Sequence, residues 1–390
     1  MKNSRAKWSS TAKNMNVTKI IPVSLGRRSY DVTVGLDLLD DVGSRLAALR
    51  PERFSNVGIV TDSHVGPLYA AALLASVRKA GLAATVVEFP AGEQNKNLTT
   101  YASLAERLLA LRPAIDRRSL LMGLGGGVVG DMAGFLAATL LRGIDFVNVP
   151  TTLLADVDAS TGGKTGVDSQ AGKNLIGAFH QPRAVLVDAT LLKSLPTEQL
   201  VSGLGECVKH AIIRDQAALD FLEQHASALL SADGATLAEV IARNVAIKAA
   251  IVSADERESG TRALLNFGHT IGHAVETAGG YGAVSHGQAV ALGMVAACRI
   301  ALRRGLITAE HEARVTRTLA LLHLPTRWAD LPALPSQAKD AATLKGIMLH
   351  DKKALAGVVR FVLPVGLGDA ALFADVNTEE VDAALAVLQG

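Results

Sequence analysis

The chain of 390 residues has almost no charge excess, few cysteines and no long uninterrupted apolar run. Lys and Arg total 39 against 37 for Asp and Glu, and a net charge of +2 gives no reason to expect nucleic acid or a membrane surface as partner. The two cysteines, Cys207 and Cys298, form no CxxC motif, which indicates a reducing compartment and excludes a thiolate zinc site. The longest apolar stretch, 120–141, contains Asp131 and three consecutive glycines, so it is not a membrane-spanning helix.

The first 30 residues carry several Lys and Arg and no acidic residue. They lack the apolar segment of a secretory signal. A transit peptide has a similar composition, but a disordered leader over residues 1–16 is the simpler interpretation. We therefore expect a cytoplasmic protein whose first domain begins at residue 17.

Short β-branched runs alternate with amphipathic stretches between residues 17 and 196. Strands are expected at 57–62, 84–89, 120–124 and 146–150, and helices at 68–80 and 98–111. This alternation predicts an α/β domain with an open, mostly parallel sheet. After Pro196 a strand signal returns only at 358–363, and helical periodicity appears at 197–213, 217–230, 236–254, 262–278 and 287–304. We therefore expect two domains, 17–196 and a helical 197–390.

A glycine-rich segment, Gly123–Asp131, follows an expected strand and opens a helical stretch. Glycine lets a backbone approach a pyrophosphate, and a helix N-terminus supplies N–H donors, but a tight strand-to-helix turn also needs glycine. The segment is not a Rossmann fingerprint, and the lack of a following Lys-Ser or Lys-Thr pair excludes a P-loop. Glu93 follows a strand, where an acid can bond a ribose hydroxyl, and Thr151 and Thr152 place hydroxyls at the carboxyl edge of the sheet. Together these features favour dinucleotide binding.

Polar side chains recur along a segment that is otherwise apolar, at Glu258, Arg262, Asn266, His269 and His273. In one continuous helix these five positions fall within an arc of about 80°. Apolar residues on the other faces indicate a buried helix whose polar stripe lines an internal cavity. A solvated face would more commonly carry Glu and Lys, so we favour the cavity.

A second polar pair, Glu206 and Lys209, lies one helical turn apart. A surface ion pair is the alternative, but the small apolar neighbours 203–205 argue against it. His286 begins the next apolar helix. A carboxylate from Glu206, a histidine of the stripe and His286 would form the ligand set of an open catalytic Zn²⁺ site, which Co²⁺ or Fe²⁺ would also fit. The spacing is not HExxH, so a zincin protease is not indicated.

Basic residues suggest a doubly anionic substrate, although a loop lysine taken alone reads as a solvated side chain. Two of them, Lys164 and Lys173, are expected in flexible glycine-rich loops. The others are Arg142, Arg262 and the pair Lys352 and Lys353.

In order and in spacing, five segments resemble the 3-dehydroquinate synthase family of sugar-phosphate cyclases. They are GGGVVGDMAGFLAATLLRGIDFVNVPTTLLADVDASTGGKTG, GKNLIGAFHQP, DERESGTRALLNFGHTIGHAVE, HGQAVALGM and HDKKALAG. The resemblance extends over roughly residues 20–368. It implies an amino-terminal NAD-binding domain, a helical metal- and substrate-binding domain, and a homodimer.

The resemblance also implies which residues serve each ligand. The metal, Zn²⁺ or Co²⁺, would be bound by Glu206, His269 and His286. NAD would be held by Glu93, Lys96, Gly126, Gly127, Val128, Val129, Gly130, Asp131, Thr151, Thr152, Lys164, Lys173 and Ser194. The sugar-phosphate substrate would be surrounded by Asp158, Lys164, Asn174, Lys209, Lys248, Glu258, Arg262, Asn266, His273, Lys352 and Lys353, with Arg142 from the neighbouring subunit.

The family reaction converts 3-deoxy-D-arabino-heptulosonate 7-phosphate into 3-dehydroquinate by transient oxidation, phosphate elimination, reduction and an intramolecular aldol step. The resemblance assigns the substrate carboxylate to Lys248 and Arg262, and the phosphate to Lys164, Asn174, Asn266 and His273. Alternatives are sister cyclases acting on sedoheptulose 7-phosphate or glucose 6-phosphate, metal-dependent polyol dehydrogenases, and a chain that keeps the fold without activity. Asn266 and the pair Lys352 and Lys353 favour the dehydroquinate pattern, and the intact ligand set favours an enzyme.

Three positions depart from the family pattern. Ser194 stands where the family usually has Thr, and Gln288 stands where it commonly has Glu. Cys207 is unusual beside the metal carboxylate, and we expect a buried small side chain there rather than a reactive thiol. Gln288 bears on the tuning of His286, not on its role as a ligand.

Overall fold

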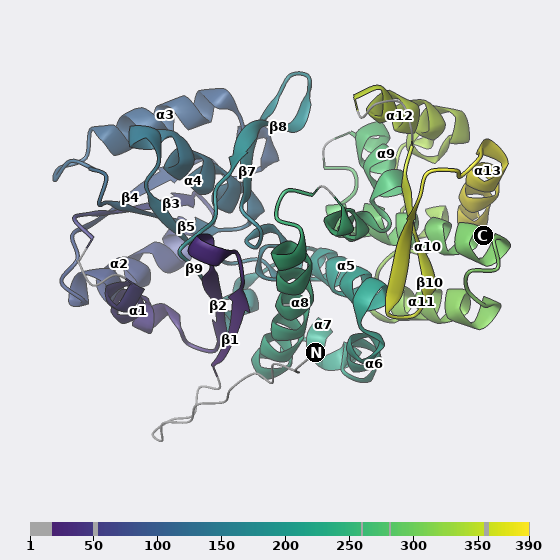
Figure 1. Cartoon of the computed structure of the whole chain (residues 1–390), viewed down its shortest axis with the longest axis horizontal. Helices are drawn as coiled ribbons and strands as arrows, with labels where there is room; N and C mark the ends of the chain where they lie inside the picture. The colour runs from purple at the N-terminus through teal and green to yellow at the C-terminus, as the bar shows by residue number, and fades with distance from the viewer. Residues whose placement is uncertain (1–17, 50–53, 259, 281, 355–358, 390) are drawn as a thin grey trace. The chain divides into compact units, whose positions relative to one another are not determined.

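The structure is a computed structural model that describes residues 18–49, 54–258, 260–280, 282–354 and 359–389, with the backbone alone for 351–354. The leader expected at 1–16 lies outside the described residues. The chain divides into two compact units (Figure 1). The first runs to Leu195 and includes Leu237–Arg257; the second comprises Pro196–Thr236 and the residues from Glu258 onward. None of the helices in the described part of the chain has the length and apolar character needed to cross a membrane.

Among the described residues of the first unit, seven strands form one sheet in the order β1-β2-β9-β6-β5-β3-β4. All neighbours in the sheet are parallel except β1, which pairs antiparallel with β2. The strands are β1 (Lys19–Val23), β2 (Tyr30–Gly35), β3 (Val57–Asp62), β4 (Ala84–Phe89), β5 (Leu120–Gly125), β6 (Asp145–Pro150) and β9 (Ala184–Asp188). The four strands and the mostly parallel α/β sheet predicted from the sequence are therefore confirmed.

Helices cover both faces of this sheet, with α1 (Val42–Leu49) and α2 (Ala71–Lys79) on one side and α3 (Leu98–Leu109) and α4 (Gly127–Thr139) on the other (Figure 1). Alternate side chains of β5 pack on opposite faces of the sheet. Leu120, Met122 and Leu124 join the core formed with α1 and α2, whereas Leu121 joins the core formed with α3 and α4. Because both faces are buried, the strand has no polar alternation and reads as a continuous apolar run.

The segment that carries Lys164 and Lys173 is a β-hairpin, so the prediction of flexible loops was wrong. Strand β7 (Lys164–Ser169) pairs antiparallel with β8 (Gly172–Phe179). Val167 lies in the core beside α4, and Ile176 packs against it. The glycine at 177 permits this pairing, because a Cβ there would lie 2.1 Å from the carbonyl oxygen of Thr165.

Helix α8 (Gly234–Ala254) belongs with the sheet of the first unit, which differs from the single boundary expected near Pro196. Its contacts give the reason. Glu239 forms an ion pair with Lys19 at the start of β1, and Ser253 accepts a hydrogen bond of 2.9 Å from the backbone N–H of Ser24. The helical content expected after residue 196 is present, but one of its long helices supports the other unit.

The second unit is built mainly of helices around α5 (Thr197–Arg214) and α10 (His286–Arg303). Its remaining elements are α6 (Gln216–Gln224), α7 (Ala226–Leu230), α9 (His269–Gly279), α11 (Ala309–Leu321), α12 (Ala341–Ala354), α13 (Thr378–Ala386) and the hairpin of β10 (Phe361–Gly366) and β11 (Asp369–Phe373). The N-terminus of α10 lies directly against α5, since a Cβ at Gly287 would be 2.0 Å from the carbonyl oxygen of Ser202. This close approach sets the position of His286 relative to α5.

The helix predicted over 262–278 is broken, so the single polar stripe was wrong as a helical face. A 3₁₀ segment, Thr261–Asn266, ends before Phe267, and α9 begins only at His269. Gly268 between them has a left-handed backbone (φ 78°), and a Cβ there would lie 2.7 Å from Met294 of α10. Close packing against α10, which the 3.6-residue pattern cannot report, therefore separates Arg262 and Asn266 from the histidines.

Candidate active site

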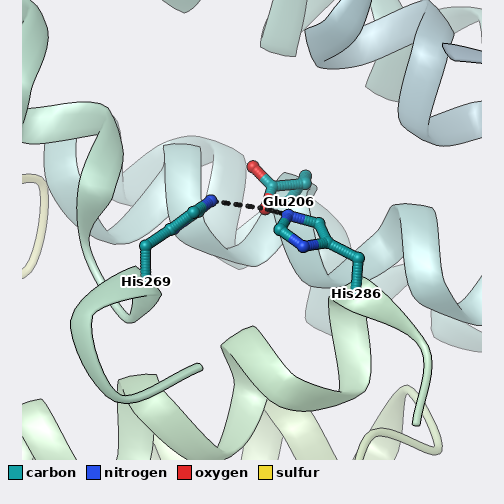
Figure 2. Close-up of side chains that lie close together, drawn as sticks. All are labelled: Glu206, His269 and His286. Atoms are coloured by element: carbon teal, nitrogen blue, oxygen red, sulfur yellow. Dashed lines mark ion pairs between the residues drawn. The ribbon is translucent and has the colours of Figure 1, made fainter. Parts of the chain in front are cut away.

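Glu206, His269 and His286 converge from α5, α9 and α10 (Figure 2). The Nε2 atoms of His269 and His286 lie 3.6 Å and 3.4 Å from the same oxygen, Oε1 of Glu206. These separations are longer than a good hydrogen bond. They match the edge of a tetrahedron, about 3.3 Å, whose corners are ligand atoms about 2.0–2.1 Å from a shared ion. The spacing of the three residues therefore fits a shared divalent metal ion.

Each imidazole has a second contact that fixes which nitrogen faces Glu206. Nδ1 of His269 lies 3.1 Å from the carbonyl oxygen of Phe267, and Nδ1 of His286 lies 3.2 Å from Oε2 of Glu276. Because both partners are acceptors, Nδ1 carries a hydrogen in each ring, and Nε2 is the nitrogen directed at Glu206 and available to a metal ion. Glu276 was not singled out from the sequence. Glu276 lies seven residues after His269, and this spacing in the sequence could have placed both residues on the same face of one helix.

Lys209 forms an ion pair with Oε2 of Glu206, one helical turn away, and both side chains are almost completely buried. The prediction that this is not a surface pair is confirmed. The two carboxylate oxygens have different partners, because Oε2 meets the ammonium group and Oε1 faces the imidazoles. Cys207, which follows Glu206 in α5, is buried and forms no disulfide, as expected.

Burial and the nearby ammonium group of Lys209 lower the pKa of His269 to about 3, which keeps this ring neutral. His286 differs. Burial acts to lower its pKa, but the contacts with Glu206 and Glu276 outweigh burial and raise the pKa to about 10.

The first turn of α10 is held by a capping box made by Ser285 and Gln288. The backbone N–H of Ser285 donates to Oε1 of Gln288 at 2.9 Å, and Oγ of Ser285 accepts from the backbone N–H of Gln288 at 3.4 Å. An amide oxygen serves this reciprocal cap as well as a carboxylate oxygen does. Gln288 thus supports the helix end that presents His286, and it is Glu276 that contacts the ring.

The other members of the predicted stripe come from three local structures. Glu258 lies in a turn with a left-handed backbone (φ 59°) and accepts a hydrogen bond of 3.2 Å from Nδ2 of Asn266. Arg262, in the 3₁₀ segment, is 2% exposed. His273 lies one turn after His269 on α9, with its ring centroid 5.1 Å from that of His269 in an edge-on arrangement, and it is exposed.

In the first unit, the glycine loop connects the buried strand β5 directly to α4. Gly126 is the N-cap of α4, and a Cβ there would lie 3.0 Å from the methyl group of Thr152. At Gly125 a Cβ would lie 2.5 Å from Val129. The loop lies where the strand order reverses, since β4 and β5 flank β3 on opposite sides. The carboxyl ends of strands at such a point are where open α/β sheets bind ligands, and the first turn of α4 offers free N–H groups to a pyrophosphate.

Lys96 connects three of the predicted ligand-binding residues. Its ammonium group donates to Oδ2 of Asp131 at 2.6 Å and to the side-chain oxygen of Asn174, and Lys96 is 4% exposed. Burial acts to lower the pKa of Lys96, but the carboxylates of Asp131, Glu93 and Asp168 outweigh burial and raise the pKa. The loop after β4, the start of α4 and the β7–β8 hairpin therefore meet at one buried cation.

A second ion pair lies within the same unit, between Lys248 of α8 and Asp158. The ammonium group contacts both the carboxylate and the carbonyl oxygen of Asp158. Thr151 is buried, Thr152 accepts a hydrogen bond of 3.2 Å from the backbone N–H of Ala155, and the hydroxyl of Ser194 lies 2.6 Å from that of Tyr69. Val128 and Gly130 lie in the first turn of α4. Arg142, Lys164 and Lys173 are exposed, and the side chains of Lys352 and Lys353 are outside the described part of the structure.

Two family profiles match adjacent parts of the chain. The profile "3-dehydroquinate synthase N-terminal" matches residues 86–202, and "3-dehydroquinate synthase C-terminal" matches residues 203–354. The 3-dehydroquinate synthase of Caulobacter vibrioides (strain NA1000 / CB15N) is 45% identical over 368 residues, which cover 94% of this chain and 98% of that protein.

Two solved structures are similar along almost the whole chain. One is 2-epi-5-epi-valiolone synthase from Streptomyces hygroscopicus subsp. jinggangensis 5008 with NAD⁺ and Zn²⁺ bound, with a TM-score of 0.82, 29% identity, and coverage of 98% of this chain and 99% of that one. The other is 2-deoxy-scyllo-inosose synthase complexed with carbaglucose-6-phosphate, NAD⁺ and Co²⁺, with a TM-score of 0.82, 27% identity, and coverage of 94% and 99%. By its profile matches and by its identity to curated relatives, the chain belongs to the 3-dehydroquinate synthase family.

Proposed function

We propose that this protein is a metal- and NAD-dependent cyclase that converts 3-deoxy-D-arabino-heptulosonate 7-phosphate into 3-dehydroquinate and phosphate. The observation that carries the proposal is the position of two imidazole nitrogens 3.4 Å and 3.6 Å from one buried carboxylate oxygen, the spacing of atoms that share an ion. Identity supports the choice of substrate. It is 45% with a curated 3-dehydroquinate synthase, against 29% and 27% with the two solved cyclases of other names.

Glu206, His269 and His286 would hold the divalent cation, and NAD would be held by the glycine loop with Lys96 and Asp131. When bound, the cation supplies Lewis acidity at a substrate hydroxyl, and NAD supplies a reversible hydride acceptor. Lys209 pairs with Oε2 of Glu206 and would orient its carboxylate toward the cation. The backbone carbonyl of Phe267 and the carboxylate of Glu276 hold the two rings with Nε2 toward the ion.

The cationic and amide side chains would bind the two anionic ends of the substrate. Arg262, almost completely buried, supplies a guanidinium that matches a carboxylate in two parallel bonds. Lys248 would share that carboxylate, and its contact with Asp158 holds its ammonium group in place. Lys164, Asn174, Asn266 and His273 would bind the phosphate, with a further contribution from Lys352 and Lys353.

We also propose a homodimer located in the cytoplasm, in which Arg142 reaches the substrate of the neighbouring subunit. Arg142 supports this in one respect: it is exposed, on a backbone with positive φ at both Leu141 (53°) and Arg142 (67°). An arginine presented on such a turn is available to a second copy of the chain.

The test is an assay for phosphate released from the heptulosonate phosphate at NAD⁺ concentrations far below substrate. The net reaction neither gains nor loses electrons, so turnover should continue without accumulation of NADH, followed by its absorbance. Stoichiometric NADH release would instead assign the protein to the polyol dehydrogenases. Comparable kcat/KM on sedoheptulose 7-phosphate would retain the cyclase but reject the dehydroquinate assignment.

A further inference from the structure

The side chains of Glu276 and His286, ten residues apart in the sequence, contact each other. Glu276 lies in the second turn of α9, and His286 is the first residue of α10. Oε2 of Glu276 is 3.2 Å from Nδ1 of His286, and both side chains are mostly buried, with exposed fractions of 17% and 28%. On the opposite side of the ring, Nε2 faces Glu206 at 3.4 Å. The ring of His286 is therefore held between two carboxylates.

The two carboxylates have different roles because Glu206 faces Nε2 of His286, whereas Glu276 faces Nδ1. With the lone pair of Nε2 directed at a metal ion, Nδ1 must carry a hydrogen and needs an acceptor. A carboxylate is a stronger acceptor than the backbone carbonyl that serves His269, so it makes the ring a better electron donor and resists its rotation. The neighbouring imidazole of His273 belongs to the same group of ligand-type side chains, within 4.8 Å. This raises the alternative that His273, Glu276 and His286 bind a second ion.

We propose that Glu276 is a positioning residue of the metal centre: its carboxylate accepts the Nδ1 hydrogen of His286 and thereby orients this ligand and strengthens its bond to the metal. The inference rests on the ligand set of the proposed function. The second-ion alternative would require Nδ1 of His286 to lose its hydrogen while Nε2 is bound to the first ion, which would turn one imidazole into a bridging anion. A single hydrogen bond to Glu276 needs no such ionisation, and the geometry points to it.

The experiment compares the wild-type protein with Glu276→Ala, Glu276→Gln and a control, Glu312→Gln. Glu312 is also a mostly buried carboxylate of the second unit, and it pairs with Arg299 at 2.7 Å. It lies on α11, which carries none of the proposed metal ligands. For each protein, Zn²⁺ stoichiometry and affinity are measured by competition with a chromophoric chelator, and the visible spectrum of the Co²⁺-loaded form is recorded. The thermal midpoint of the metal-free form reports folding.

Glu276→Ala should retain one ion per chain with an affinity reduced about 10- to 100-fold, the usual cost of removing an outer partner of a metal-bound histidine. Glu276→Gln keeps an oxygen acceptor and should lose less. The Co²⁺ spectrum should shift in both variants and not in Glu312→Gln. A cooperative thermal transition in the metal-free form of each variant would show that the variant folds.

Three results would overturn the inference. Unchanged affinity and an unchanged Co²⁺ spectrum in Glu276→Ala would mean that the carboxylate does not act through His286. Two ions per wild-type chain, one of them lost in Glu276→Ala, would establish the second-ion alternative. A wild-type protein that binds no stoichiometric ion would reject the ligand set itself, so failure of the proposed function is distinguishable from failure of this inference alone.

Discussion

Glu206 in the second unit and Asp156 in the first are both fully buried carboxyl groups, with exposed fractions of 0% and 1%, yet their surroundings are opposite. Glu206 has an ammonium partner in Lys209 and two imidazoles facing its other oxygen. Neither oxygen of Asp156 has a hydrogen-bond partner among the described residues. Burial, reinforced by the negative charge of Asp188, raises the pKa of Asp156 well above its ordinary value.

The difference separates a buried carboxylate that has charged partners from one that has none among the described residues. A buried charge persists only where other groups compensate it, so the second unit has assembled cations and ligands around Glu206. Among the described residues Asp156 has no such groups, and its pKa is raised accordingly. Burial alone is therefore a weaker pointer to a candidate site than burial with partners from separate helices.

The largest expected effect comes from removing one ligand of the Glu206 cluster. His269→Ala should abolish both metal retention and turnover, because two remaining ligands cannot hold an ion at an open site. The measurement is metal content after dialysis, together with phosphate release from the heptulosonate phosphate. A variant that keeps a stoichiometric ion would show that the ligand assignment is wrong.

The next largest effect tests whether Arg262, a buried cation of the second unit, binds the substrate. Arg262→Lys should lower kcat/KM for the heptulosonate phosphate by roughly 2–4 kcal/mol of transition-state stabilisation, because Lys cannot form the two parallel bonds of a guanidinium. Arg317→Lys is the matched control, since Arg317 lies in the same unit and is 62% exposed. Equal losses in the two variants would mean that Arg262 has no specific role in substrate binding.

The sequence predicted the sheet of the first unit well and the second unit less completely. Strands such as β3 and β5 are buried on both faces, so their apolar runs are visible without any tertiary information. The burial of Glu206 could be inferred because its helical neighbours are small or apolar. These features depend on residues adjacent in the chain, which is why they were predictable.

The features that were missed depend on contacts between distant segments. The break at Gly268 follows from packing against Met294, whereas the apolar periodicity continues through it. The glycines of the β7–β8 hairpin suggested loops, but there they allow two strands to approach closely. The contact between Glu276 and His286 joins two helices, so sequence spacing alone could give its helical face but not its partner.

Asp156→Asn tests the other side of the comparison and should be stabilising. The pKa of Asp156 in the folded state lies above its unfolded value of about 3.8, so the folded protein holds an extra proton between the two values. The free energy of unfolding of the wild type therefore falls as pH rises through this window, by up to about 1.4 kcal/mol per pH unit. Asn cannot ionise and escapes this loss.

Thermal midpoints of wild type and Asp156→Asn should thus coincide near about pH 4 and separate as pH rises, with the variant higher. Asp188→Asn is an informative contrast. Asp188 accepts backbone hydrogen bonds of 3.0 Å from Asp37 and Leu39, so its variant should be less stable than wild type at neutral pH. Parallel curves for wild type and Asp156→Asn would mean that folding does not raise the pKa of Asp156.

The smallest expected effect concerns how the second unit positions its ligands. Gln288→Glu restores the residue common in the family, and a carboxylate oxygen can accept the same hydrogen bond from the backbone N–H of Ser285. Its negative charge in the first turn of α10 also suits the helix dipole, so stability and Zn²⁺ affinity should change by no more than about 0.5 kcal/mol. Ser285→Ala removes the cap itself and should lower the free energy of unfolding by about 1 kcal/mol. Zn²⁺ affinity altered more by Gln288→Glu than by Ser285→Ala would mean that residue 288 acts on His286 directly and not through the helix end.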